Sequence, residues 1–81
     1  MRLDKYLKVS RVIKRRTVAN EACDAGLVTV NGKTARASCD VKPGDVLEIT
    51  FGTRVTRLRV RSVEEHAKKE DAADMYEFLP G

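Results

Sequence analysis

The chain has 81 residues, with 16 Lys and Arg against 12 Asp and Glu, and carries a formal net charge of +4. A chain of this length forms one small domain with a modest core, so any function must lie on its surface. Its longest uncharged stretch, 25–32, is far shorter than the ~20 apolar residues of a membrane span, and the N-terminus lacks the apolar run of a signal peptide, which together predict a soluble cytoplasmic protein without membrane contact.

A short amphipathic helix is expected over residues 3–11, with the sequence LDKYLKVSR. Leu3 and Leu7 are four residues apart and therefore share one face of a helix. Asp4 falls in the first turn, where the helix dipole favours a carboxylate. The pattern predicts a helix that begins close to the N-terminus.

A second helix is expected over residues 17–25, with Thr17 as its N-cap and Gly26 just after its end. Its apolar stripe contains Val18, Ala19, Ala22 and Cys23. The basic residues Lys14, Arg15 and Arg16 would then lie just before a helix N-terminus, where unpaired N–H groups and the positive end of the dipole favour phosphate. The alternative is that this triplet is only a solvated corner between two helices.

A β-hairpin should follow the helices directly. LVTV alternates and is rich in β-branched residues, Asn31-Gly32 is a strong hairpin turn signal, and KTAR returns as the partner strand. Lys33 comes immediately after the turn and is expected on the same side as the basic helices, although a register shift of one residue would reverse its face.

Two further strands are expected after the turn at Pro43-Gly44. In the first, 46–51, one face carries Leu47, Ile49 and Phe51. In the second, 56–63, apolar residues alternate with arginines, which is typical of an antiparallel strand with one buried face. Its arginines, Arg57, Arg59 and Arg61, form a second basic feature whose simplest role is to solvate the sheet and discourage aggregation.

The charges are distributed unevenly along the chain. Residues 1–16 contain seven bases and one acid, a local net charge of +6, and residues 17–63 contain seven bases and five acids, a net charge of +2. Residues 64–81 contain two bases and six acids, a net charge of −4. The basic end is therefore a candidate polyanion site, whereas the acidic end is a solvating tail, a docking helix or a contact for a basic partner.

No catalytic, cofactor or metal site is expected. Cys23, Cys39 and His66 lack the spacing of a zinc site, so Cys23 is expected as a buried thiol and Cys39 as a loop thiol. His66 is the only histidine and lies in the charged segment EEHAKKE, with no nucleophile or orienting carboxylate arranged around it. The sequence therefore argues against an enzyme.

The motif order resembles the S-four RNA-binding domain, named for ribosomal small-subunit protein four, over roughly residues 1–49. The shared features are the opening Arg-Leu-Asp-Lys, an arginine before the second helix, Gly26 ahead of a strand, Val30-Asn31-Gly32 and Gly44-Asp45. The resemblance implies an α+β, αL-like fold in which two N-terminal helices pack on a small, mainly antiparallel sheet.

Over essentially the whole chain, the sequence is also similar to the bacterial ribosome-quality-control factors of this family, which are related to the small heat-shock S-four proteins. The opening MRLDKYLKVSRVIKRRT, the central VKPGD and the later KKEDAADMYE carry this similarity. It implies binding to large ribosomal subunits through ribosomal RNA and peptidyl-tRNA. It also implies assistance to the partner RqcH, which adds a C-terminal alanine tail to the stalled nascent chain.

Carried over residue by residue, the resemblance implies an RNA-binding set of Arg2, Lys5, Lys14, Arg15, Arg16, Asn31 and Lys33. Arg2 and Arg16 are the first choices for contacts with the RNA backbone, because an arginine fork suits phosphate oxygens. Asp4 is expected to orient Arg2 or Arg16 by an ion pair while it stabilises the start of the helix. Many S-four domains have Ser or Thr in place of Arg15, so a hydroxyl contact at that position does not carry over.

Two other functions stay open: an S-four module that acts in trans with an RNA-modifying enzyme, and a DNA-binding regulator whose helix pair mimics a helix-turn-helix. The domain is expected to span 1–63 and to be a monomer, with 64–81 as an acidic tail or short docking helix. The apolar residues of that last segment are Ala72, Ala73, Met75, Tyr76, Phe78 and Leu79. The flanking charges and the final Pro-Gly favour a loosely held terminus.

Overall fold

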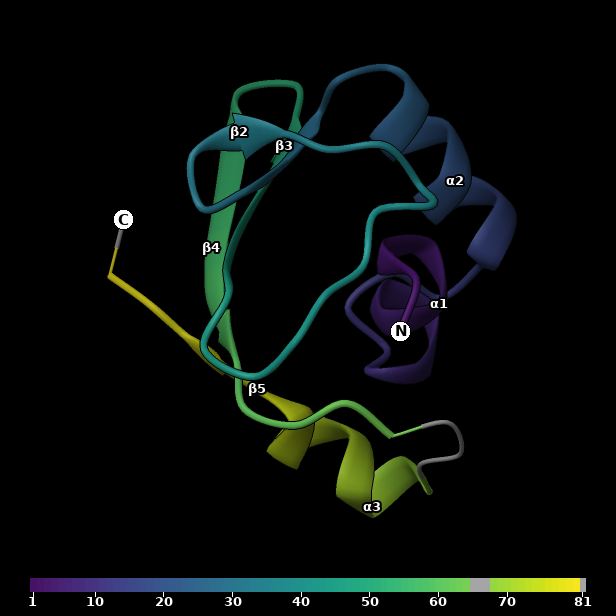
Figure 1. Ribbon diagram of the computed structural model, residues 1–81, viewed down its shortest axis with the longest axis vertical. Helices are drawn as coiled ribbons and strands as arrows, with labels where there is room; N and C mark the ends of the chain where they lie inside the picture. Colours follow the sequence, from purple (N-terminus) through teal and green to yellow (C-terminus); the bar gives the residue numbers. More distant parts are fainter. Residues whose placement is uncertain (65–67, 81) are drawn as a thin grey trace.

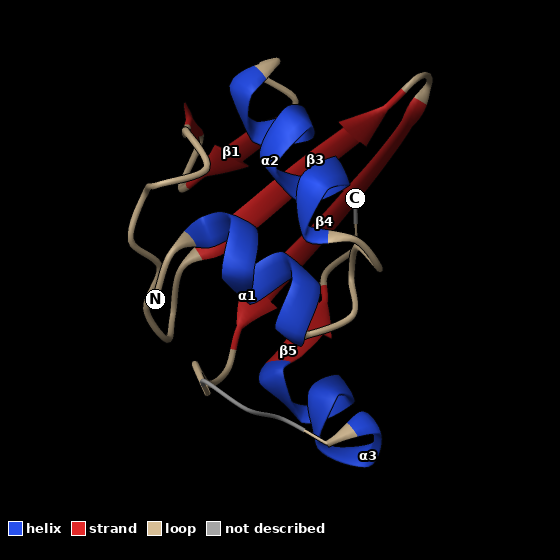
Figure 2. Cartoon of the chain, turned by 90° about the vertical axis from the view of Figure 1, so that its right-hand side faces the viewer, coloured by secondary structure: helices blue, strands red, loops and turns tan. Residues whose placement is uncertain are grey.

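Two short helices open the chain and pack against each other on one side of a sheet (Figure 2). Helix α1 spans Leu3–Val9 and helix α2 spans Arg16–Asp24 in the computed structural model, which describes residues 1–64 and 68–80. Within the described residues, no helix is both long and apolar enough to cross a membrane. The α+β class and the N-terminal helix pair expected from the sequence are confirmed.

The start of α2 differs from the prediction. Arg15, and not Thr17, is the N-cap: its backbone is extended, and its carbonyl oxygen accepts a hydrogen bond from the Ala19 N–H at 3.1 Å. Arg16 is therefore the first residue of the helix rather than a residue before it. The predicted end is confirmed, since Gly26 follows the C-cap with a φ of +79° that an L side chain rarely adopts.

The apolar stripe of α2 is narrower than predicted. Ala19, Ala22 and Cys23 are buried, but Val18 is 38% exposed because it lies at the edge of the face that turns toward the core. Only small side chains are buried along this helix. The backbone of α2 can therefore lie close to its neighbours in a domain that has little core volume.

The sheet has five antiparallel strands in the order β2-β1-β3-β4-β5. In Figure 1 the sheet lies to the left of helices α1 and α2. The predicted hairpin is confirmed, because Asn31 and Gly32 both adopt positive φ, +53° and +85°, as a tight two-residue turn requires. The strands are β1 (Val28–Val30), β2 (Lys33–Thr34), β3 (Val46–Phe51), β4 (Arg54–Val60) and β5 (Tyr76–Phe78).

The core lies between the sheet and the helices. Side chains alternate along β3 and β4, so that Leu47, Ile49, Leu58 and Val60 are buried against the helix pair, as predicted. Phe51 lies on their face, as predicted, but it is 45% exposed. The opposite face of the sheet carries the arginine row.

Two arginines of that row are paired with acids across the strands. Arg57 Nε lies 2.9 Å from Glu48 Oε1, in an ion pair without hydrogen-bond alignment at Nε, and Arg59 Nη1 donates to Glu77 Oε1 at 3.2 Å. Cross-strand partners of opposite charge stabilise a sheet surface modestly. This pairing favours a structural role for Arg57 and Arg59.

The C-terminal segment is held more firmly than the sequence suggested. A helix α3 (Lys69–Ala72) and a 3-10 helix η1 (Ala73–Met75) lead into β5, which pairs with β4. Ala72 and Met75 are buried, and the buried Tyr6 hydroxyl donates to the Met75 carbonyl oxygen at 2.7 Å. The docking alternative therefore describes this segment better than the loose tail.

Candidate nucleic-acid interface

The extreme N-terminus is fixed to the loop that precedes β3. The terminal ammonium of Met1 binds Asp40 Oδ1 at 2.7 Å, and the Met1 carbonyl oxygen accepts from the Val41 N–H at 2.8 Å. The Leu3 N–H donates to the Cys39 carbonyl oxygen at 2.7 Å. These bonds hold Arg2 in extended backbone just before α1, with its side chain half exposed.

Asp4 is the centre of a polar cluster on the helix pair. Its side chain is only 2% exposed, yet its carboxylate accepts hydrogen bonds from both helices. Oδ1 accepts from Arg2 Nε at 3.2 Å and from the Lys5 N–H at 2.8 Å, and Oδ2 accepts from Arg2 Nη2 at 3.4 Å. Oδ2 also accepts from Arg16 Nε at 3.4 Å and from Asn20 Nδ2 at 3.3 Å.

The carboxylate of Asp4 is held in its charged form. Burial raises its pKa, but hydrogen bonds from Asn20, Arg2 and the Lys5 N–H, together with the charge of Arg16, outweigh burial and lower the pKa below its usual value. An ionised carboxylate at this position attracts both guanidinium groups. The first helical turn thus supplies the negative charge that orders two cations around it.

Arg2 and Arg16 keep donors available for a ligand. A guanidinium has five N–H donors. Asp4 accepts from two nitrogens of Arg2, Nε and Nη2, and from one nitrogen of Arg16, Nε, so it engages only part of each fork. Both side chains are about half exposed, at 52% and 50%. They border a shallow hollow of about 440 Å³ whose lining also includes Thr17, Asn20 and Glu21.

Asn20 was missed in the sequence analysis. Its amide donates to Asp4 while it lies one helical turn after Arg16, so both residues reach the same carboxylate from one face of α2. The spacing of four between Arg16 and Asn20 is visible in the sequence. The sequence does not show that Asp4 lies against that face of α2, so the spacing alone could not identify Asn20 as a partner of Asp4.

The other basic residues of the predicted set are not part of the lining of this hollow. Lys14 and Arg15 are exposed on the segment that leads into α2, and Lys5 is half-buried in the first turn of α1. Lys33, the first residue of β2, pairs with Val30 of β1. Val30 pairs in turn with the buried Leu47 of β3. Because cross-strand partners share a face, Lys33 lies on the helix side of the sheet.

Asn31 is engaged within the protein. Its Nδ2 donates to Asp45 Oδ1 at 3.0 Å, and its Oδ1 accepts from the Val46 N–H at 3.0 Å. Asp45 is itself buried and also accepts from the Lys42 N–H at 3.0 Å. This network ties the hairpin turn to the start of β3, so Asn31 positions the turn.

The cysteines lie apart from this surface chemistry. Cys23 is buried, as predicted, and burial together with the charges of Asp4 and Asp24 raises the pKa of its thiol to about 11. Such a thiol is a poor nucleophile at neutral pH. Cys39 is half-buried in a loop, also as predicted. His66 lies outside the described residues.

The family model of the S4 domain matches residues 1–47, a span that contains α1, α2, the hairpin and the start of β3. The chain therefore belongs to the S4 domain family. A solved structure supports the same fold over a longer span: the trimeric Heat Shock Protein 15 of Vibrio cholerae aligns with a TM-score of 0.88 at 25% identity, covering 98% of this chain and 81% of that chain.

Two relatives narrow the family further. Both are named RQC P-site tRNA stabilizing factor, and each alignment covers 98% of this chain. The Bacillus subtilis protein is 53% identical with 92% of its length covered, and the Streptococcus pneumoniae protein is 54% identical with 90% covered. The chain belongs to the family of these factors.

Proposed function

We propose that this protein binds RNA without catalysing a reaction, and that the surface around Asp4 is its main contact. The observation that carries the proposal is the buried carboxylate that holds Arg2 and Arg16 half exposed at the junction of α1 and α2. Two preoriented guanidinium groups suit phosphate oxygens, because less side-chain freedom is lost when they bind. The exposed Lys14, Arg15 and Lys33 add longer-range attraction.

The expected contact is with shape and backbone rather than with base sequence. A-form RNA hides its base edges in a deep, narrow major groove, so a small basic surface meets mainly phosphates and ribose hydroxyls. The hollow beside Asp4 is lined by two carboxylates, an amide and a hydroxyl as well as two arginines. Such a mixed lining accommodates phosphate together with a neighbouring ribose hydroxyl.

The names of the relatives support a role in ribosome-associated quality control. We propose that the protein acts in the cytoplasm. In the proposed mechanism, the protein binds an obstructed large ribosomal subunit through ribosomal RNA and peptidyl-tRNA. It then holds the tRNA in the P site while RqcH adds the alanine tail. The protein acts as a monomer that positions RNA, and the chemistry belongs to the ribosome and its substrates.

Co-sedimentation with large subunits that carry peptidyl-tRNA tests this proposal. Arg2→Ala and Arg16→Ala should each weaken binding by about tenfold, the loss expected for a charged hydrogen bond. Thermal stability should change little, because Asp4 keeps Asn20 and the Lys5 N–H as partners. Arg59→Ala is the matched control, since it removes the same charge from the opposite face of the sheet.

Full co-sedimentation of both variants at moderate salt would refute the proposed surface. Equal binding to ribosomal RNA and duplex DNA at matched salt would point instead to non-specific charge attraction. In a reconstituted tailing reaction with RqcH, Arg16→Ala should shorten the alanine tails. Unchanged tails despite lost subunit binding would separate the protein from the tailing step and favour a more general S-four module.

A further inference from the structure

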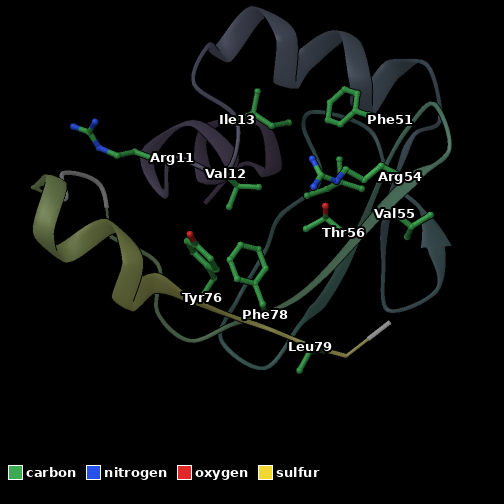
Figure 3. Close-up of a pocket in the computed structure, with 11 residues that line it drawn as sticks. Arg11, Val12, Ile13, Phe51, Arg54, Val55, Thr56, Tyr76, Phe78 and Leu79 are labelled. Carbon is green, nitrogen blue, oxygen red and sulfur yellow. The ribbon is translucent and has the colours of Figure 1, made fainter.

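The sheet extends beyond the helices that cover it and leaves an apolar groove of about 600 Å³ (Figure 3). Phe51 pairs with Arg54 across the β3–β4 hairpin, and Phe78 pairs with Leu58. Cross-strand partners share a face, so these side chains continue the face that carries the core. The connection between α1 and α2 borders the groove through Val12 and Ile13.

Aromatic rings are the main apolar feature of this groove. Phe51 is 45% exposed and Phe78 is 64% exposed, which is costly for rings of this size in a small domain. Phe78 also meets Tyr76 edge-on, with ring centroids 5.0 Å apart and an interplanar angle of 73°. This edge contact holds Phe78 while its flat face stays available.

The charges that border the groove have one sign. Its lining includes Arg54 and Arg11 and no acidic residue, and neither arginine has an ion-pair partner within residues 1–64 and 68–80. In Figure 3, Arg54 lies between Phe51 and Thr56, whereas Arg11 extends away from the rings at the outer rim.

The backbone of Arg11 gives a second reason to consider a ligand. It has a φ of +64° just after the C-cap of α1, where glycine is the favoured residue. An arginine at this position costs conformational energy, and its exposed cation adds to the charge of the rim.

We propose that this groove binds an unpaired nucleotide of single-stranded RNA. The base would stack on Phe78 or Phe51, and Arg54 and Arg11 would bind the phosphates on either side. The inference rests on the proposed RNA-binding function, but it concerns a second surface: the hollow beside Asp4 contains no aromatic residue. An apolar peptide would fill the groove without using either unpaired arginine, so the charges favour RNA.

Anisotropy titrations with two probes test the proposal. One probe is a short labelled oligouridine, and the other is an abasic oligomer of the same length, which keeps the phosphates and lacks the bases. Wild-type protein should bind oligouridine more tightly. At least one of Phe78→Leu and Phe51→Leu should weaken oligouridine binding by about fivefold or more and leave abasic binding unchanged, because leucine keeps the apolar area but cannot stack.

Phe78→Trp is the matched control and should retain the preference for bases, while thermal melts establish that each variant is folded. Arg16→Ala should lower the affinity for both probes without removing the difference between them. This pattern distinguishes a wrong proposal for the groove from a wrong proposal for the surface around Asp4.

Equal affinity of the wild type for both probes would overturn the proposal for the groove. It would also be overturned if both leucine variants bound oligouridine normally. Leucine variants that instead alter self-association would assign the groove to a second copy of the chain.

Discussion

The carboxylate of Asp4 links the stability of the helix pair to the orientation of its cations. It is buried, but it accepts from donors on both helices, so its charge is compensated inside the protein. The same bonds limit the rotamers of Arg2 and Arg16. One residue thus contributes to folding and prepares the proposed phosphate contacts, and a substitution should affect both.

Asp4→Asn should lower the free energy of unfolding at pH 7 by about 1–2 kcal/mol, a modest value because both partner guanidiniums are half exposed and screened by water. The pKa of Asp4 is lower in the folded state than its usual value. Its stabilisation is therefore complete above the ordinary carboxyl pKa of about 4 and is lost as the pH falls through the folded pKa.

Urea unfolding of the wild type and Asp4→Asn between pH 7 and pH 3 measures this dependence. The difference in stability between the two proteins should shrink toward the acid end. A difference that is constant over the whole range would contradict an ionised, stabilising carboxylate.

Single residues differed in how far the sequence predicted their roles. The place of Asp4 in a first helical turn is a local signal for the start of a helix, whereas its ion pair with Arg2 or Arg16 was expected from the positions that match the family. Asn31 was understood only in part: the turn was recognisable from Asn-Gly, but the bonds to Asp45 and Val46 join segments that are far apart in the chain. Asn20 was missed for the same reason, because its partner lies on the other helix.

At the level of elements, the C-terminal segment closes the fold. β5 adds an edge strand to β4, and Met75 fills the space beside Tyr6. The Met75 carbonyl oxygen also accepts from the Arg61 N–H at 2.8 Å. The segment is therefore bound through both its backbone and its buried side chains, so its contribution to stability should be measurable.

Met75→Ala should lower the free energy of unfolding by about 2–5 kcal/mol, the usual cost of a cavity in a core. Tyr6→Phe should cost only about 1 kcal/mol, because the Met75 carbonyl oxygen keeps its backbone donors. Chemical denaturation measures both values. Asp74→Ala, an exposed change in η1, is the control and should stay within about 0.5 kcal/mol of the wild type. A Met75→Ala protein as stable as this control would mean that the segment is not docked in solution.

Elements formed by local contacts were predictable, and those formed by distant contacts were not. The hairpin at Asn31-Gly32 and the strand at 46–51 follow from turn chemistry and alternation over a few residues. The three-residue strand β5 has no such signal, since it is defined by pairing with β4. Phe51 shows what a local pattern cannot predict. The alternation along 46–51 identified the correct face of the strand, but not that this face continues past the helices that cover it.

Across the whole molecule, the distribution of charge separates two kinds of arginine. On the outer face of the sheet, Arg57 and Arg59 are paired with glutamates, whereas Arg2 and Arg16 share a single carboxylate between them. Asp4 and Glu21 both line the hollow with these two arginines, so the net positive charge at the helix junction comes from Lys14 and Arg15, which are exposed just before α2. On the outer face of the sheet, the charges of Arg57 and Arg59 are balanced by their partners. Composition alone predicts a basic protein, but the fold determines which cations are available to a polyanion.

This separation predicts the salt dependence of binding. Contact with about five phosphates gives a slope of roughly −4 when the logarithm of the association constant for large subunits is plotted against the logarithm of salt concentration. Arg2→Ala or Arg16→Ala should make that slope shallower by about 1, since one phosphate contact is lost. Arg59→Ala should leave the slope unchanged, although it removes the same formal charge, because Arg59 is paired with Glu77 on the other face.

Titrations at several salt concentrations measure the three slopes. An equal decrease for all three variants would mean that overall charge, and not the surface around Asp4, drives the association.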